Sequence, residues 1–240
     1  MPFQTTVNTY PAPACAGDFA SDNPRASLVS PEAGFVAGSG GVNAGVFAWV
    51  QNDGKTVQNV ADGVVLTFGT PAASDGTGYT TASGLATTGG SGSGCTVSIT
   101  ASGGAITAAT VTSGGTGYKI GDVLTVVQSG GAAGTLTVAT ITPTGQMGFV
   151  PRRQQGLITT YLAEYGNNVP AGFAVTVMRT GDYWFKANNN AAVRGQKIFA
   201  NLSDGTTQTA ATGATVSGYI ETNFFVSQAC GSGELGIMSY

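Results

Sequence analysis

The chain has 240 residues, of which 42 % are hydrophobic and only 9 % are charged, and its formal net charge at pH 7 is −3. Ordinary domains carry about a quarter of charged residues, so this chain is poor in charge. Its few, scattered basic residues exclude the positive footprint of a nucleic-acid-binding protein. No run of 18 apolar residues occurs, so we expect neither a membrane-spanning helix nor a membrane partner.

Glycine supplies 38 residues, about twice the usual share, in short clusters between runs rich in Thr, Val and Ile. This pattern is typical of short strands joined by tight turns and predicts an all-β protein. The length allows one large or two smaller domains, each with a core of its own.

The start of the chain and its cysteines indicate the compartment. Residues 1–4 lack the basic and then apolar beginning of a signal peptide, so we expect synthesis in a cytoplasm. The three cysteines, Cys15, Cys95 and Cys230, are widely spaced and odd in number. This argues against a disulfide framework or a zinc site and predicts buried free thiols.

Residues 1–13 alternate β-formers with polar residues and end in Pro-Ala-Pro, which favours an extended backbone and excludes a helix. Two interpretations stay open. The segment is a loose terminus or edge strand, or it is an arm that pairs with a neighbouring subunit by strand addition. In the second case Phe3, Val7 and Tyr10 are the candidate subunit contacts.

The first strands predicted after this arm lie at 46–51, 56–57 and 64–68. Asn52-Asp53-Gly54 predicts a hairpin turn between the first two.

Residues 70–145 form a glycine- and threonine-rich segment with an internal repeat. Gly76-Thr-Gly-Tyr79 recurs as Gly115-Thr-Gly-Tyr118, 39 residues later, and the strand-like stretch 94–99 recurs in type at 134–139. We expect two repeats of about 39 residues that pack on each other as a small β-sandwich or β-prism, rather than a flexible linker. Tyr79 and Tyr118 are the candidate exposed tips of this unit.

Further strands are predicted at 173–178, 183–185, 195–201, 222–227 and 234–240, with a hairpin turn at 203–205. The stretch 157–165 fits a strand or one face of a helix. Its β-branched pair Thr159-Thr160 and its flanking glycines favour the strand.

The sequence offers no recognisable catalytic site. It contains no histidine, which excludes Ser/His/Asp and Cys/His arrangements, and no acid spacing suits calcium. We therefore assign no catalytic, cofactor-binding or metal-binding residue and expect no enzyme. A polysaccharide hydrolase that uses two carboxylates stays as a minor alternative. We expect Trp49 and Trp184 in the core rather than on a sugar-binding surface.

The adjacent pair Arg152-Arg153 allows two interpretations. It is a solvated loop pair, or one of the two makes a fork-shaped contact across a subunit interface, where arginine is enriched.

One region of the chain resembles a known family. Gly-Phe-Val-Pro-Arg-Arg-Gln-Gln (148–155), Leu-Ile-Thr-Thr-Tyr-Leu-Ala-Glu (157–164), Pro-Ala-Gly-Phe (170–173) and Gly-Asp-Tyr-Trp-Phe-Lys (181–186) resemble the structural cement, or capsid decoration, proteins of tailed bacteriophages. The first residues and the closing strand resemble that family more loosely, and the glycine- and threonine-rich segment departs from it.

The resemblance implies a host domain made of 1–69 and 146–240, a β-sandwich of jelly-roll type, interrupted by an inserted domain at 70–145. It also implies a non-enzymatic virion protein on the outer surface of the head, which binds the major capsid protein as a homodimer or homotrimer. The alternative is a tail-fibre or adhesin component whose repeat domain binds a host-surface glycan through exposed Tyr79 and Tyr118.

Overall fold

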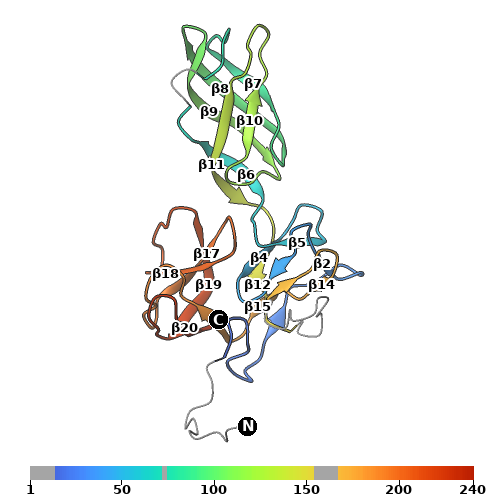
Figure 1. Cartoon of the computed structure of the whole chain (residues 1–240), viewed down its shortest axis with the longest axis vertical. Coiled ribbons are helices and arrows are strands. Elements are labelled where there is room, and N and C mark those ends of the chain that lie inside the picture. The colour runs from blue at the N-terminus through green and yellow to red at the C-terminus, as the bar shows by residue number, and fades with distance from the viewer. Residues whose placement is uncertain (1–13, 72–74, 154–166) are drawn as a thin grey trace, which may run out of the picture.

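The computed structural model describes residues 14–71, 75–153 and 167–240, and in this part of the chain all regular structure is β-strand (Figure 1). The all-β prediction is confirmed. The strands form a seven-stranded, a six-stranded and a five-stranded sheet and a two-stranded ribbon. The predicted arm (1–13) and the undecided stretch 157–165 lie outside the described residues.

The seven-stranded sheet has the order β1-β15-β12-β4-β5-β2-β14. Its strands are β1 (Ala26–Ser27), β2 (Phe35–Ala37), β4 (Phe47–Val50), β5 (Thr56–Gln58), β12 (Met147–Phe149), β14 (Ala174–Val175) and β15 (Met178–Thr180). The predicted hairpin at Asn52-Asp53-Gly54 is confirmed, since β4 and β5 pair antiparallel across it. The single strand predicted at 173–178 is wrong. Its two halves become β14, which pairs with β2, and β15, which pairs with β1 and β12.

Strand β4 is buried on both faces of this sheet. Phe47 and Trp49 belong to one core cluster, and Ala48 and Val50 belong to another. Successive side chains of a strand point to opposite faces, so β4 has a core on each side. The ribbon of β3 (Val42–Asn43) and β13 (Asn168–Val169) contributes buried valines to the second cluster.

The five-stranded sheet has the order β16-β20-β19-β17-β18. Its strands are β16 (Tyr183–Lys186), β17 (Lys197–Asn201), β18 (Thr207–Ala210), β19 (Tyr219–Gln228) and β20 (Leu235–Ser239). The predicted hairpin at 203–205 joins β17 and β18, and the last strand pairs with both β16 and β19. The predicted hairpin at 203–205 and the strand predicted at 234–240 are confirmed.

An aromatic seam joins the seven- and five-stranded sheets. The ring of Phe47 lies 5.8 Å from that of Phe224, and the ring of Phe149 lies 5.0 Å from that of Tyr183. Such pairs contribute about 0.5–1.5 kcal/mol each beyond the burial of their area. Trp49 is fully buried as expected, whereas Trp184 is only half-buried. The jelly-roll arrangement stays a prediction.

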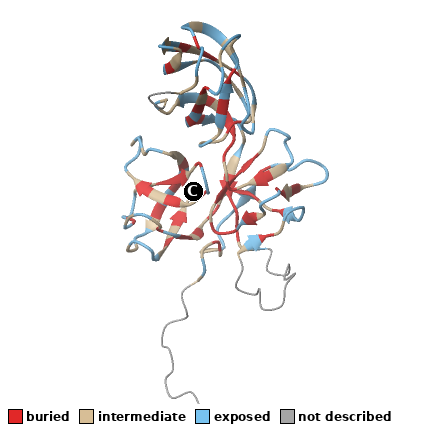
Figure 2. Ribbon diagram, turned by 45° about the horizontal axis from the view of Figure 1, so that its top comes forward, coloured by how far each residue is buried: buried red, intermediate tan, exposed pale blue. Residues whose placement is uncertain are grey.

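The six-stranded sheet has the order β6-β11-β10-β7-β8-β9. Its strands are β6 (Gly63–Phe68), β7 (Ala82–Thr88), β8 (Ser93–Ser102), β9 (Ala105–Thr116), β10 (Val123–Val126) and β11 (Thr135–Pro143). A bridge between Gly63 of β6 and Tyr118, which follows β9, connects the two ends of the sheet, so the sheet curls into a barrel-like unit (Figure 1). Figure 2 shows buried residues inside this unit and along the seam below it.

Two pairings bear on the predicted organisation of the six-stranded unit. Strand β6, which we expected to belong with the first host segment, pairs with β11. The two repeats are joined at the centre of the sheet by the direct pairing of β7 with β10, and their packing as a β-sandwich or β-prism stays a prediction.

Candidate contact surfaces of the seven- and five-stranded sheets

The first described residues extend the edge of the five-stranded sheet. The Gly17 amide donates to the Trp184 carbonyl at 2.8 Å, and the Trp184 amide donates to the Asp18 carbonyl at 2.9 Å. Phe19 forms an antiparallel bridge with Tyr183, and their ring centroids lie 5.6 Å apart. The chain before β1 is therefore fixed along β16.

Two exposed arginines share the half-buried ring of Phe19. The guanidinium carbon of Arg25 lies 4.1 Å from the ring centroid, and that of Arg153 lies 5.5 Å from it. A cation over an aromatic face gains about 0.5–1 kcal/mol at an exposed site. Among the described residues neither arginine has an ion-pair partner. We call Phe19, Arg25 and Arg153 the arginine corner.

Arg152 lies next to this corner but contacts its own chain. Its amide donates to the Gly17 carbonyl at 2.9 Å, and its guanidinium lies 3.9 Å from the Asp18 carboxylate. Its Nε is buried and has no hydrogen-bond partner within the part of the chain that the structure describes. Of the predicted pair, Arg153 is thus presented to solvent, whereas Arg152 connects β12 to the segment before β1.

The acids beside the corner stabilise loops. The Asp182 carboxylate accepts hydrogen bonds from Ser21 Oγ and Asn23 Nδ2, both at 2.6 Å. Partial burial acts to raise the pKa of Asp182, but these hydrogen bonds outweigh it and hold the pKa below its ordinary value. Burial raises the pKa of Tyr183 to about 12. Neither group is tuned for proton transfer near neutral pH.

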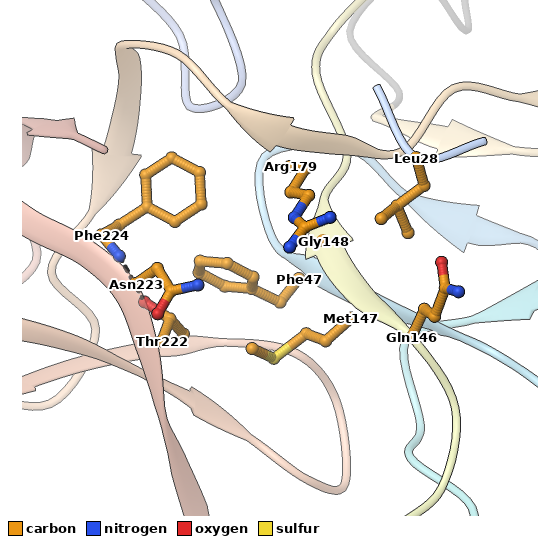
Figure 3. Close-up of a pocket in the computed structure, with 9 residues that line it drawn as sticks. All are labelled: Leu28, Phe47, Gln146, Met147, Gly148, Arg179, Thr222, Asn223 and Phe224. Atoms are coloured by element: carbon orange, nitrogen blue, oxygen red, sulfur yellow. Dashed lines mark hydrogen bonds between the residues drawn. The ribbon is translucent and has the colours of Figure 1, made fainter. Parts of the chain in front are cut away.

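A groove of about 380 Å³ opens where the seven- and five-stranded sheets meet (Figure 3). One wall comes from β19, and the other comes from β4, β12, β15 and the end of β1. The residues that line it are Leu28, Phe47, Gln146, Met147, Gly148, Arg179, Thr222, Asn223 and Phe224. We call it the inter-sheet groove.

The lining of the inter-sheet groove suits binding rather than catalysis. Met147 supplies accessible apolar surface beside the buried rings of Phe47 and Phe224, and Asn223 and Gln146 supply amides. Among the described residues of the lining, Arg179 is the one charged side chain. None of the described residues that line the groove carries a carboxylate, thiol or imidazole. Across the part of the chain that the structure describes, no three His, Cys, Asp or Glu side chains are grouped so that they could hold a metal ion. Within that same part, no helix has the length and apolarity for a membrane crossing.

Tyr79 and Tyr118 are not exposed tips. They are 3 % and 1 % exposed, so this prediction is wrong. The reason is that each ring folds back over a glycine. A Cβ atom at Gly131 would lie 2.6 Å from the Tyr79 ring, and one at Gly92 would lie 2.6 Å from the Tyr118 ring.

The tyrosine hydroxyls bind main-chain groups inside the six-stranded unit. The Tyr79 hydroxyl donates to the Val126 carbonyl and accepts from the Gly134 amide, at 2.9 and 3.1 Å. The Tyr118 hydroxyl accepts from the Cys95 amide at 3.4 Å. Gly134 follows Cys95 by the same 39 residues that separate the tyrosines.

The cysteines are only partly as expected. All three are free, but Cys15 is exposed, Cys230 is half-buried and only Cys95 is buried. Cys15 is exposed because it lies before the segment 17–20 that pairs with β16.

The remaining predicted contact residues, Phe3, Val7 and Tyr10, lie outside the described residues. Sequence reasoning missed Phe19, Arg25 and Arg179. The signal that could have found the arginines is their scarcity. The chain has five arginines, and the four at 25, 152, 153 and 179 all lie at or beside the two candidate surfaces.

Comparison with known proteins gives one family. The XM1 gp53 minor capsid protein family matches residues 3–147 and 141–238. No curated protein matches the chain. The matched ranges cover most of the sequence, and the arginine corner and the inter-sheet groove both lie within them. The chain therefore belongs to the XM1 gp53 family of phage minor capsid proteins and is a structural protein of the virion.

Proposed function

We propose that the protein binds the outer surface of the assembled phage head and links neighbouring major capsid subunits, as a cement protein does. The observation that carries the proposal is the arginine corner. Two exposed guanidinium groups lie over one aromatic ring in a chain with a net charge of −3. Protein interfaces are enriched in arginine and aromatic residues. The minor capsid family supports a place in the virion.

A capsid lattice favours such a contact. The shell repeats the same surface many times, so a protein that touches two or three subunits gains avidity without one tight contact. We propose that it acts as a homodimer or homotrimer, and that residues 1–13 serve as an arm whose Phe3, Val7 and Tyr10 contact the capsid or a neighbouring copy.

We further propose that 1–69 and 146–240 form the host domain and that 70–145 is inserted into it. The six-stranded sheet, which runs from Gly63 to Pro143, supports an inserted unit, with β6 from the end of the first host segment as one of its strands. In Figure 1 that unit lies at one end of the molecule, and the first described segment, in dark blue, lies at the other. An insertion at such a site costs little, because closure entropy grows slowly with loop length.

The test is co-sedimentation of the purified protein with phage heads that lack it, in the precursor and the expanded form. We expect saturable binding to the expanded head. The double variant Arg25→Ala/Arg153→Ala should bind roughly tenfold more weakly, which corresponds to about 1.4 kcal/mol. The control Lys55→Ala/Arg194→Ala removes two exposed cations outside the corner and should bind normally.

Absence of binding to either head form, with the protein located on the tail, would overturn the proposal. It would favour the tail-fibre alternative, in which the six-stranded unit binds a host glycan. That alternative called for exposed tyrosine rings, which Tyr79 and Tyr118 do not provide.

A further inference from the structure

We propose that the inter-sheet groove is a docking site for an extended segment of the capsid subunit that carries a carboxylate beside a large apolar side chain. This inference rests on the proposed function and adds a second contact surface to it. Three features of the groove carry it: its apolar floor, the single cation among the described residues of its lining, and its continuation into a second hollow.

The floor of the groove is apolar and fixed. Phe47 is fully buried and Phe224 is 3 % exposed, and their rings pack edge to face at 5.8 Å. Phe47 also packs against Phe149 at 5.4 Å, so the floor is part of the aromatic seam and does not rearrange without disturbing both sheets. A rigid apolar hollow is the usual seat of an anchoring side chain at an interface. Met147, half-buried beside it, gives an adaptable wall.

The charge of the groove selects the partner. Arg179 is exposed, is the one charged side chain of the lining and has no ion-pair partner among the described residues. A guanidinium beside apolar surface pairs with a carboxylate through two parallel hydrogen bonds. The amides of Gln146 and Asn223 can bind the partner's main chain. One cation matches one carboxylate, whereas a nucleic acid would need a row of cations.

The groove continues into a second hollow. That hollow, of about 260 Å³, shares Gln146 with the groove and is lined further along by Val29, Phe35 and Val50. Val29 follows groove residue Leu28 and is 91 % exposed. An extended segment could therefore run from Arg179 past Gln146 to Val29. Strand β1 lies just before Leu28 at the outer edge of its sheet and offers main-chain groups to such a segment.

The experiment compares Arg179→Ala with Arg194→Ala in co-sedimentation with expanded heads that lack the protein. Both arginines are exposed, so equal thermal unfolding of the two variants controls for folding. We expect Arg179→Ala to bind roughly tenfold more weakly, from loss of a charge-assisted pair, and Arg194→Ala to bind normally. Arg179→Lys keeps the positive charge but loses the planar guanidinium that can make two parallel hydrogen bonds to a carboxylate, so this variant should bind with intermediate strength.

Hydrogen exchange of the head-bound protein locates the contact. Slower exchange is expected at 27–29, 146–148, 178–180 and 222–224. Wild-type binding without this protection, and with Arg179→Ala unaffected, would overturn the groove site and leave the proposed function standing. Protection of the same segments without heads, rising with protein concentration, would overturn the assigned occupant in favour of a second copy of this chain. Failure of the wild type to bind heads would instead overturn the proposed function.

Discussion

Replacing Tyr79 with phenylalanine removes one hydroxyl from the interior of the six-stranded unit. That hydroxyl serves the Val126 carbonyl and the Gly134 amide, and the tyrosine is 3 % exposed. The substitution leaves two buried main-chain groups without a partner, and each such loss costs about 1–3 kcal/mol. The two losses are not fully additive, because one small shift of β10 and β11 can relieve both in part. We therefore expect the free energy of unfolding of this unit to fall by about 2–4 kcal/mol.

Tyr118→Phe is the matched control in the same unit. The Tyr118 hydroxyl accepts one hydrogen bond, from the Cys95 amide at 3.4 Å, which is long for a protein hydrogen bond. The main-chain bonds between Tyr118 and Gly63 are unaffected by the change. We therefore expect a loss of less than about 1 kcal/mol.

The assay is hydrogen exchange across residues 63–143, combined with urea unfolding. Both tryptophans, Trp49 and Trp184, lie outside that range. Tryptophan fluorescence therefore follows the seven- and five-stranded sheets, while hydrogen exchange follows the six-stranded unit. Exchange of the Gly134 region should rise strongly in Tyr79→Phe and slightly in Tyr118→Phe. Equal effects, or a larger effect at Tyr118, would refute the assignment of stability to the hydroxyl bonds of Tyr79.

Three further predictions concern other parts of the chain. Burial raises the pKa of Tyr183 from 10.0 to about 12. The stability that its neutral hydroxyl contributes is therefore complete below pH 10 and is lost as the pH rises toward 12. The urea midpoint of unfolding should fall between these pH values, and it should fall less in Tyr183→Phe. Cys15 is exposed, whereas Cys95 is buried and its pKa is raised by burial, so a thiol reagent should label the native protein first at Cys15, and Cys15→Ser should remove that fast phase. Gly63 and Pro143 are paired neighbours, so replacing 64–142 with a short turn should preserve the cooperative unfolding seen by tryptophan fluorescence; its loss would contradict the proposed division into host and insert.

The sequence predicted best where a short segment determines its own structure. Asp53 accepts hydrogen bonds from the amides of Lys55 and Thr56, and Asp204 accepts one from the amide of Thr206. These are the side-chain bonds that make aspartate a turn residue. Both hairpins were therefore predictable from a few adjacent residues.

Prediction failed where the partner lies far away in the chain. Residues 173–178 alternate like one strand, but the halves pair with β2 and with β1, which no local pattern specifies. Gly-Thr-Gly-Tyr79 has the composition of a loop tip, and its glycines by themselves indicate only a turn. The glycine that receives the Tyr79 ring, Gly131, lies more than 50 residues onward.

The candidate surfaces depended on distant pairing as well. Arg153 was identified from its neighbour Arg152, but Arg25 joins it only because both flank Phe19, which is held against Tyr183. Arg179 becomes a groove residue because β19 packs opposite β12 and β15. Sequence alone showed that the arginines are few, which is a reason to examine each of them, but it could not show which ones would meet.

The two proposed contact surfaces should respond to salt in opposite ways, which makes them separable. Arg25 and Arg153 are exposed, and at about 1 M ionic strength the screening length is only about 3 Å, so the contribution of the corner should vanish there. The groove combines one cation with a floor of buried Phe47 and Phe224, and sulfate strengthens apolar contacts. Head binding that persists in sulfate should therefore be insensitive to Arg25→Ala/Arg153→Ala and sensitive to Met147→Ala. If both variants lose binding in parallel at every salt concentration, the corner and the groove form one contact rather than two.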